Sequence, residues 1–481
     1  MVIEMPENPK HVYPYTPQDP KEQSRPLHEE LPTVDVLPSS EPSAARSQHQ
    51  KWNSPRINLL RVLATFYSFI ILGANDAAYG ALIPYLETYY NVNYTIISLV
   101  FLSPIVGYTT SALLNNMIHM RLGQRGVAVM MSFAHLIAYM AICLHPPYPV
   151  LVVVFSLAGF GNGLGDSAWN AWVGDMANAN EVLGFLHGFY GLGAAISPLI
   201  ATTVLTKAGW MWYEFYYLMV GAAALEVVIL VSAFWKADAK AYLASHPQAG
   251  GVGDLEDSAH STPNGGLHLK EKTKWQKMNP FRNGRSRTAE ALKNKVTILT
   301  AVFLLIYVGI EVSIGGWIVV FMLRVRHGSP FASGMTSTGF WLGITVGRLI
   351  LGFVTARLFK TEKHAVATYI TACVALQLMF WLIPQFVVSA VMIGLLGFFL
   401  GPLFPAAVVA LTKLLPKHLH VASIGFAAAM GASGACVLPF VVGAIANAKG
   451  VIVLQPIVLA MLVVCLVVWV WIPKLPKQRM A

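Results

Sequence analysis

Residues 157–176 read Leu-Ala-Gly-Phe-Gly-Asn-Gly-Leu-Gly-Asp-Ser-Ala-Trp-Asn-Ala-Trp-Val-Gly-Asp-Met. The stretch lies inside a long apolar segment, yet Asn162, Asp166 and Asn170 recur in it at four-residue spacing. In a helix this spacing places the three side chains on one face, one above another. Glycines at every second position from 159 to 165 would let neighbouring helices approach closely, as small residues do between membrane helices. A carboxylate at membrane depth is costly, so the stretch marks a functional site.

The composition of the whole chain is that of a membrane protein. Of 481 residues, 56% are hydrophobic and only 12% are charged, whereas soluble proteins have about 25% charged residues. The apolar residues gather in segments of roughly 20 or more, long enough to cross about 30 Å of hydrocarbon. The sequence predicts an all-α membrane protein with twelve transmembrane helices. The predicted spans are 59–84, 95–118, 125–145, 149–172, 183–206, 213–236, 296–323, 333–357, 365–385, 388–412, 420–446 and 451–473.

The twelve spans fall into two sets of six, at 59–236 and 296–473, and both sets have the same length. The glycine pattern of residues 157–163 returns at 395–401 in the fourth span of the second set. Weak repeats that agree with equal lengths indicate a parallel duplication of six-helix units. We therefore expect an N-terminal and a C-terminal six-helix bundle with these bounds.

Three polar segments flank and join the bundles. Residues 1–58 are rich in proline and charge and are predicted to form a disordered tail, 237–295 a linker, and 474–481 a short C-terminus. The basic part of the linker either lies against an anionic membrane surface or is a flexible, positively charged loop.

The distribution of positive charge predicts the topology. With both termini on one side, that side collects 28 of the 33 lysines and arginines, and the loops of the opposite side hold four. This asymmetry predicts that both termini and the linker are cytoplasmic. We expect the plasma membrane rather than the vacuole or another organelle. Because the basic residues follow the loops, the net charge of +10 does not indicate nucleic-acid binding.

Several classes of chemistry have no sequence signal. The four cysteines all fall within apolar segments and have neither metal-ligand spacing nor a disulfide framework. Phosphate-binding loops, zinc clusters and nucleophile triads are also missing from the sequence. We therefore expect no enzymatic activity, no metal and no cofactor.

Four acids are predicted at membrane depth, namely Asp76, Asp166, Glu226 and Glu311. The ionised carboxylate is disfavoured away from water, so such a group can take up a proton on one side and release it on the other. We predict that Asp76 and Asp166 couple transport to protons. Glu226 has apolar neighbours and is expected to be structural or peripheral. The alternative for each acid is a pairing with a nearby donor that fixes helix packing.

Polar and aromatic residues close to these acids are predicted to contact the transported solute. They are Asn75, Asn162, Trp169, Asn170, His187, Tyr190, Tyr307, Glu311 and Trp317. A lone histidine such as His187 is more often a hydrogen-bonded packing group than a proton relay. Arg348, toward the inner end of the span 333–357, is predicted to be a gating or packing charge.

Several of these motifs resemble the major facilitator superfamily and, within it, the fucose permease branch of sugar–cation symporters. Residues 307–315, Tyr-Val-Gly-Ile-Glu-Val-Ser-Ile-Gly, resemble that branch's signature in the seventh helix. The Asn75-Asp76 pair resembles its Asn-Asp in the first helix, whose Asp is linked to proton coupling. Residues 165–170 resemble a Leu-Glu-Thr-Ala-Ala-Asn element in the fourth helix, and 401–405 a Phe-Pro or Tyr-Pro element in the tenth.

The chain also departs from this branch. Position 166 is Asp where the branch has Glu, and the loop at 121–125 keeps basic residues but lacks the usual Asp. The long linker and proline-rich tail indicate a eukaryotic relative, and we expect a fungal one. The branch includes sodium-coupled carriers, so the resemblance leaves proton and sodium both open.

The resemblance implies the major facilitator fold and secondary active transport of a small polar solute, such as a sugar, by alternating access. Its partners would be that solute, the coupling ion and the lipid bilayer. Two alternatives stay open: proton-antiport efflux of a metabolite or toxin, and a non-transporting nutrient receptor. Sugar uptake compared with drug sensitivity separates symport from efflux, and proton flux on addition of substrate separates a transporter from a receptor.

Overall fold

The computed structural model describes residues 50–177, 179–245, 290–359 and 361–474. Most of the predicted tail and linker and nearly all of the predicted C-terminus lie outside these residues. The described end of the predicted tail, 50–58, is ordered, since it contains the start of α1 at Arg56. Within the described part, the long elements are all α-helices, and the only β-type pairing is an isolated bridge between Lys51 and Ser54. The prediction of an all-α fold is confirmed.

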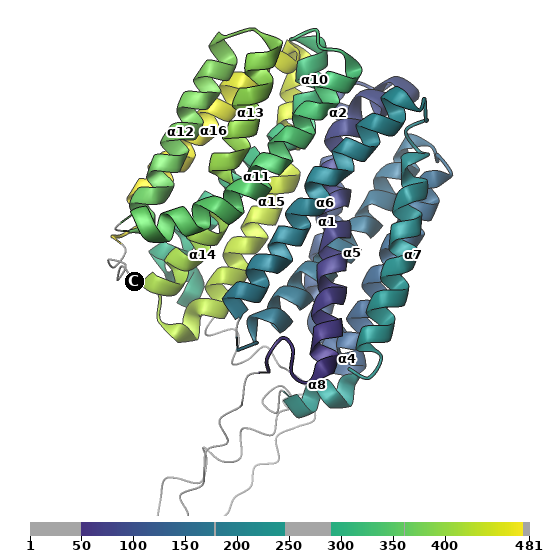
Figure 1. Ribbon diagram of the computed structural model, residues 1–481, viewed down its shortest axis with the longest axis vertical. Helices are drawn as coiled ribbons and strands as arrows, with labels where there is room; N and C mark the ends of the chain where they lie inside the picture. Colours follow the sequence, from purple (N-terminus) through teal and green to yellow (C-terminus); the bar gives the residue numbers. More distant parts are fainter. Residues whose placement is uncertain (1–49, 178, 246–289, 360, 475–481) are drawn as a thin grey trace, which may run out of the picture. The chain divides into compact units, whose positions relative to one another are not determined.

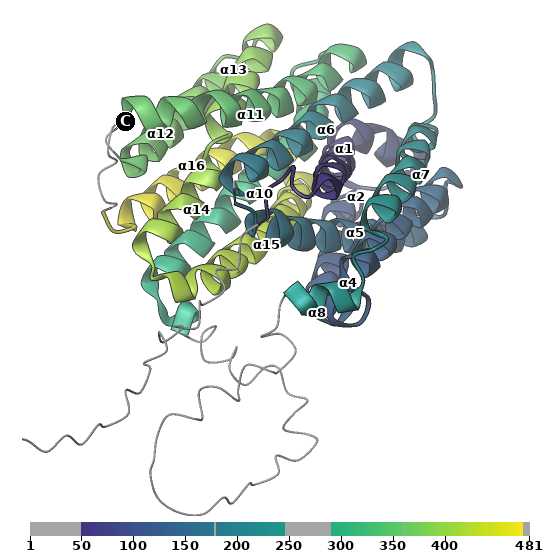
Figure 2. The same ribbon diagram turned by 60° about the horizontal axis from the view of Figure 1, so that its bottom comes forward.

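The first half of the structure runs from α1 to α7, and the second half from α10 to α16. The helices of the first half are α1 (Arg56–Tyr90), α2 (Tyr94–Ile97), α3 (Leu99–Leu102), α4 (Pro104–Cys143), α5 (Tyr148–Gly174), α6 (Ala179–Lys207) and α7 (Phe215–Phe234). The short helix α8 (Ala239–Ser245) follows and lies within the predicted linker. Figures 1 and 2 show the first half, purple to teal, beside the second, green to yellow.

The second half has the same character. Its elements are α10 (Lys295–Arg324), α11 (Pro330–Leu358), α12 (Glu362–Leu382), α13 (Phe386–Leu400), α14 (Leu403–Leu414), α15 (Lys417–Lys449), the 3₁₀ turn η2 (Val451–Val453) and α16 (Leu454–Trp471). Polar side chains cap its first helices. Asn294 accepts a hydrogen bond from the Val296 backbone N–H, and Ser329 accepts one from Ala332. Such caps satisfy donors that the first helical turn leaves free.

Eleven helical segments of the described chain are long and apolar enough to cross a membrane, and one of them, Tyr94–Cys143, has 50 residues. At about 1.5 Å per residue it would be roughly 75 Å long, far more than one crossing needs. Gly123 interrupts it with φ 71° and ψ −166°. A Cβ at this position would lie 2.3 Å from the backbone carbon of Asp238, so both the conformation and the space require glycine. The two segments on either side of Gly123 complete twelve crossings, as predicted.

The two halves touch through α1 against α10, α6 against α11, and α2 and α3 against α15. One close approach is between Gly80 and Gly315, where a Cβ on Gly80 would lie 2.0 Å from the Gly315 carbonyl oxygen. The Trp317 ring lies 5.6 Å from Tyr94 and 6.1 Å from Phe101, measured between ring centroids. These contacts lie toward the C-terminal ends of α1 and α10, so the halves are packed together at that end.

Candidate functional site

Asp76 lies where α1, α5 and α6 meet. Its Oδ1 accepts hydrogen bonds from Asn75 Nδ2 at 3.1 Å and from Asn162 Nδ2 at 2.8 Å. Its Oδ2 accepts one from the Tyr190 hydroxyl at 2.9 Å. The donors come from three helices, and Asp76 itself is only partly buried. Three donors on one carboxylate favour its ionised form, so the structure shows Asp76 as an acceptor.

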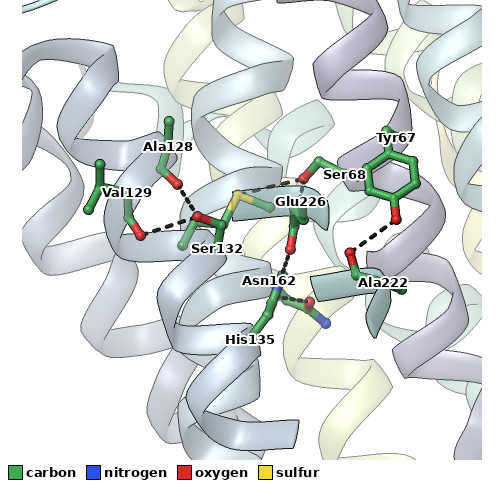
Figure 3. A network of polar contacts seen from close by, with 10 residues as sticks. Tyr67, Ser68, Ala128, Val129, Ser132, His135, Asn162, Ala222 and Glu226 are labelled. Atoms are coloured by element: carbon green, nitrogen blue, oxygen red, sulfur yellow. Dashed lines mark hydrogen bonds and ion pairs between the residues drawn. The ribbon is translucent and has the colours of Figure 1, made fainter. Parts of the chain in front are cut away.

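A chain of hydrogen bonds continues from Asp76 into the interior of the first half. Asn162 Oδ1 lies 3.0 Å from His135 Nε2, and His135 Nδ1 lies 2.9 Å from Glu226 Oε2. Ser68 Oγ donates to Glu226 Oε1 at 2.8 Å. Figure 3 shows these side chains meeting from α1, α4, α5 and α7. The side chains of His135 and Glu226 are both 0% exposed, so this branch of the site has no contact with solvent.

Glu226 is predicted to be structural or peripheral. Its side chain is buried and pairs with His135 and Ser68, so it is not peripheral, and this pairing fits the structural role. His135 was not predicted as a site residue. The available signal was one histidine and one acid in separate apolar spans of the same half, since an ionisable residue in a membrane segment has a partner by default. Their separation of 91 residues conceals the pairing in the sequence.

The glycines of residues 159–165 make this arrangement sterically feasible. A Cβ on Gly161 would lie 2.5 Å from His135 Cδ2, and one on Gly163 would lie 2.2 Å from Ser111 Oγ. Both contacts are to α4, and α4 and α5 pack against each other along their lengths. The glycines therefore let α4 approach, as expected, and leave room for the imidazole ring.

The polar stripe on α5 is divided between two environments. Asn162 is 1% exposed and belongs to the buried chain of hydrogen bonds. Asp166 is exposed and accepts from Asn170 Nδ2 at 2.8 Å, while Asn170 Oδ1 lies 3.1 Å from His187 Nε2. Asp166, Asn170 and His187 thus form a separate polar group that links α5 to α6. It is open to solvent, whereas the Asn162 group is closed.

The acid of the second half has a cationic partner. Glu311 Oε1 on α10 lies 3.4 Å from the Arg348 guanidinium on α11. Arg348 Nε also donates to the Gly401 carbonyl oxygen at 3.1 Å. The Tyr307 hydroxyl, one turn before Glu311, is buried beside the Glu311 and Arg348 side chains. Arg348 therefore joins α10, α11 and the α13–α14 junction.

The two predicted tryptophans lie in packing positions. Trp169 and Trp317 are both 0% exposed. Trp169 stacks on Phe234 with ring centroids 4.6 Å apart, and Trp317 Nε1 donates to the Pro439 carbonyl oxygen at 2.9 Å. These contacts place both rings between helices. Solute contact by Trp169 and Trp317 stays a prediction.

Within the described residues, no group of three or more histidine, cysteine or acidic side chains is placed to hold a metal ion. The four cysteines are free thiols. The chemistry that this site offers is hydrogen bonding and proton exchange among carboxylates, amides, hydroxyls and imidazoles.

Comparison with known proteins identifies the family. The sequence profile of the Major Facilitator Superfamily matches residues 65–357, which is more than half of the chain. The chain belongs to the Major Facilitator Superfamily. The chain is similar to Bypass of stop codon protein 6 from the yeast Saccharomyces cerevisiae. The two are 28% identical over 429 residues, which cover 87% of this chain and 83% of the relative.

Membership in the Major Facilitator Superfamily gives the hydrogen-bonded acids their context. The chain is a multi-pass membrane protein of a secondary-transporter family, whose members move small-molecule solutes. Buried ionisable residues in such proteins mark solute pathways and proton relays.

Proposed function

We propose that this protein is a proton-coupled symporter that carries a small polar solute, such as a sugar, by alternating access. The observation that carries the proposal is Asp76: a partly buried carboxylate at the junction of three helices, held by Asn75, Asn162 and Tyr190. Among the described residues it forms no ion pair with a lysine or arginine. Its charge is therefore balanced by neutral donors, which can adjust when a proton binds.

Protonation of Asp76 would change contacts between helices. The ionised carboxylate accepts from Asn162 on α5 and from Tyr190 on α6. Once Asp76 carries a proton, it becomes a donor on one oxygen, and at least one of these partners has to turn or separate. In this proposal the change in the α1–α5–α6 contacts favours the movement of one half against the other, as alternating access requires.

The exposed group of Asp166, Asn170 and His187 supports a polar solute. Carboxylate, amide and imidazole together offer several acceptors and donors to hydroxyl groups. Asp166 would serve as a second proton-exchanging group at this site. From the second half, Tyr307 and the Glu311–Arg348 pair would complete the contacts, with Arg348 holding α10, α11 and the α13–α14 junction as a gate.

The donors around Asp76 favour the proton over sodium. Hard cations require several oxygen ligands, whereas the three groups around Asp76 present N–H or O–H donors to it. The motif at 307–315 and the Asn75-Asp76 pair support a place in the fucose permease branch and a fungal relative. The charge distribution supports cytoplasmic termini and a plasma-membrane location, with bundles at 59–236 and 296–473.

The direction and coupling can be tested in reconstituted vesicles with radiolabelled fucose and glucose. Symport predicts that uptake rises when the outside is more acidic than the interior, and that a sodium gradient without a pH gradient gives no rise. Protein-free vesicles provide the background. Uptake driven only by a sodium gradient would contradict the proposal and support a sodium symporter. Solute movement only in the direction opposite to the proton flux would contradict it and support an antiporter.

A further inference from the structure

The contact between His135 and Glu226 requires one proton more than these two side chains carry in the unfolded chain at neutral pH. Asn162 donates through Nδ2 to the carboxylate of Asp76, so its Oδ1 is the atom that faces His135. An amide oxygen only accepts, and His135 Nε2 must therefore carry a hydrogen. In a neutral imidazole with its hydrogen on Nε2, Nδ1 is a lone pair.

That lone pair would face a carboxylate oxygen. His135 Nδ1 and Glu226 Oε2 are 2.9 Å apart, and the other oxygen of Glu226 is already the acceptor for Ser68. Two acceptors at this distance repel each other unless a proton lies between them. The proton is either on the imidazole, which then pairs as a cation with the carboxylate, or on the carboxyl group. Both forms contain one proton more than neutral histidine with ionised glutamate.

We propose that the His135–Glu226 pair is a further proton-binding site, coupled to Asp76 through the Asn162 amide. The proton of the pair follows from the geometry alone, while its part in transport rests on the proposed function. Both side chains are fully buried, and Asp76 is the partly exposed end of the chain of hydrogen bonds. Asp76 is accordingly the group through which the state of the pair is linked to solvent.

The coupling comes from the two orientations of an amide. In the observed orientation, Asn162 donates to ionised Asp76 and accepts from His135, and the pair holds its proton. Figure 3 shows the contacts of Asn162, His135 and Glu226. In the reversed orientation Asn162 accepts from protonated Asp76 and donates to a lone pair on His135 Nε2. The remaining imidazole hydrogen is then on Nδ1 and faces ionised Glu226. Both states contain the same number of protons, so a proton on Asp76 disfavours one on the pair.

No neighbouring cation balances the charge of Glu226, so the proton of the pair has this role. Tyr67 on α1 donates to the Ala222 carbonyl oxygen on α7. Tyr139 on α4 stacks beside His135 with ring centroids 5.8 Å apart, and its hydroxyl has no hydrogen-bond partner among the described residues. No described lysine or arginine forms an ion pair with Glu226, and Asp76, beyond Asn162, is the acid that faces the pair from α1. A fixed cation therefore does not replace the proton.

The proton can be detected without solute, from the pH dependence of unfolding of the purified protein in detergent. Unfolded histidine and glutamate have ordinary pKa values of about 6.5 and 4.3, so the unfolded chain lacks this proton above about pH 7. The folded wild type binds one proton more, and its stability falls as pH rises. In Glu226→Gln the amide can donate to His135 Nδ1, so no extra proton is needed. We expect the folding constant of the wild type to fall by up to about tenfold per pH unit relative to this variant.

The expected reading is a difference in unfolding midpoint between wild type and Glu226→Gln that narrows from about pH 7 to about pH 9. His135→Gln removes the imidazole, and the difference in unfolding midpoint between wild type and this variant should narrow in the same way. The second variant preserves the test if one of the two fails to fold. Tyr67→Phe removes a hydrogen bond between the same helices, α1 and α7. Its unfolding midpoint should change with pH in parallel with that of the wild type. A difference that is constant with pH for both Gln variants would overturn the proposal. Because neither solute nor gradient is used, failure of the uptake experiment leaves this result standing.

Discussion

The two halves of the molecule treat their buried acids differently. In the first half, Asp76 and Glu226 are held by amides, hydroxyls and an imidazole, and no described lysine or arginine pairs with them. In the second half, Glu311 faces the Arg348 guanidinium at 3.4 Å. A permanent cation stabilises an ionised carboxylate, whereas neutral donors allow the carboxylate to gain and lose a proton. In the proposed function, proton exchange therefore takes place in the first half, and the second half contains a fixed charge pair.

Removing the cation of the second half should have the largest effect on stability. Arg348→Met leaves Glu311, whose side chain is 7% exposed, without its partner and leaves the Gly401 carbonyl oxygen without a donor. Breaking a buried pair in this way costs about 3–5 kcal/mol, to be measured by thermal or denaturant unfolding. The double variant Glu311→Gln with Arg348→Met should recover most of the loss. Equal losses in the single and double variants would show that Arg348 acts by packing alone.

In the first half, loss of the Asn162 side chain, which links Asp76 to His135, should lower stability. Asn162→Leu removes a donor from Asp76 and an acceptor from His135, both inside the protein. Each group left without its partner costs about 1–3 kcal/mol. Asn170→Leu, on the same face of α5 but in the exposed group, should cost about 1 kcal/mol or less. Unfolding of the two variants side by side checks this, and similar losses would contradict the division of the stripe into a buried and an open part.

The sequence was sufficient for the fold and for part of the site. Apolar runs long enough to cross a membrane predicted the twelve crossings, because hydropathy depends only on local composition. Four-residue spacing placed Asn162, Asp166 and Asn170 on one face, since helix geometry is local as well. Which helix faces that stripe is a tertiary property. The His135–Glu226 contact and the packing of Trp169 depend on helices that are distant in sequence, and no local pattern contains them.

The contact between the halves can be tested at Gly80. Gly80→Ala would place a methyl carbon 2.0 Å from the Gly315 carbonyl oxygen, so α1 and α10 would have to separate. Overpacking of this kind costs about 1–3 kcal/mol. Gly221→Ala is a matched control on α7, where a Cβ meets nothing within 4 Å. Thermal unfolding should show a loss only for Gly80→Ala, and a tolerated alanine there would place the close contact elsewhere.

The smallest effect is expected where the halves meet at the surface. Arg324 lies 3.6 Å from Glu87, with side chains that are 56% and 18% exposed. An exposed pair contributes about 1 kcal/mol or less, and salt screens it. Glu87→Gln should therefore shift the unfolding midpoint slightly at low salt and not measurably at high salt. A large, salt-independent loss would indicate that this pair, rather than the Gly80 contact, holds the halves together.

The assignment of proton exchange to the first half is tested most directly by proton movement during transport. Vesicles containing the wild type and a pH-sensitive dye should acidify inside when fucose or glucose, whichever the wild type accumulates, is added outside. Asp76→Asn should exchange labelled sugar across the membrane without acidification, whereas Glu87→Gln, which lies outside the proposed solute contacts, should keep the wild-type ratio of protons to solute. Acidification by Asp76→Asn at that same ratio would contradict the account.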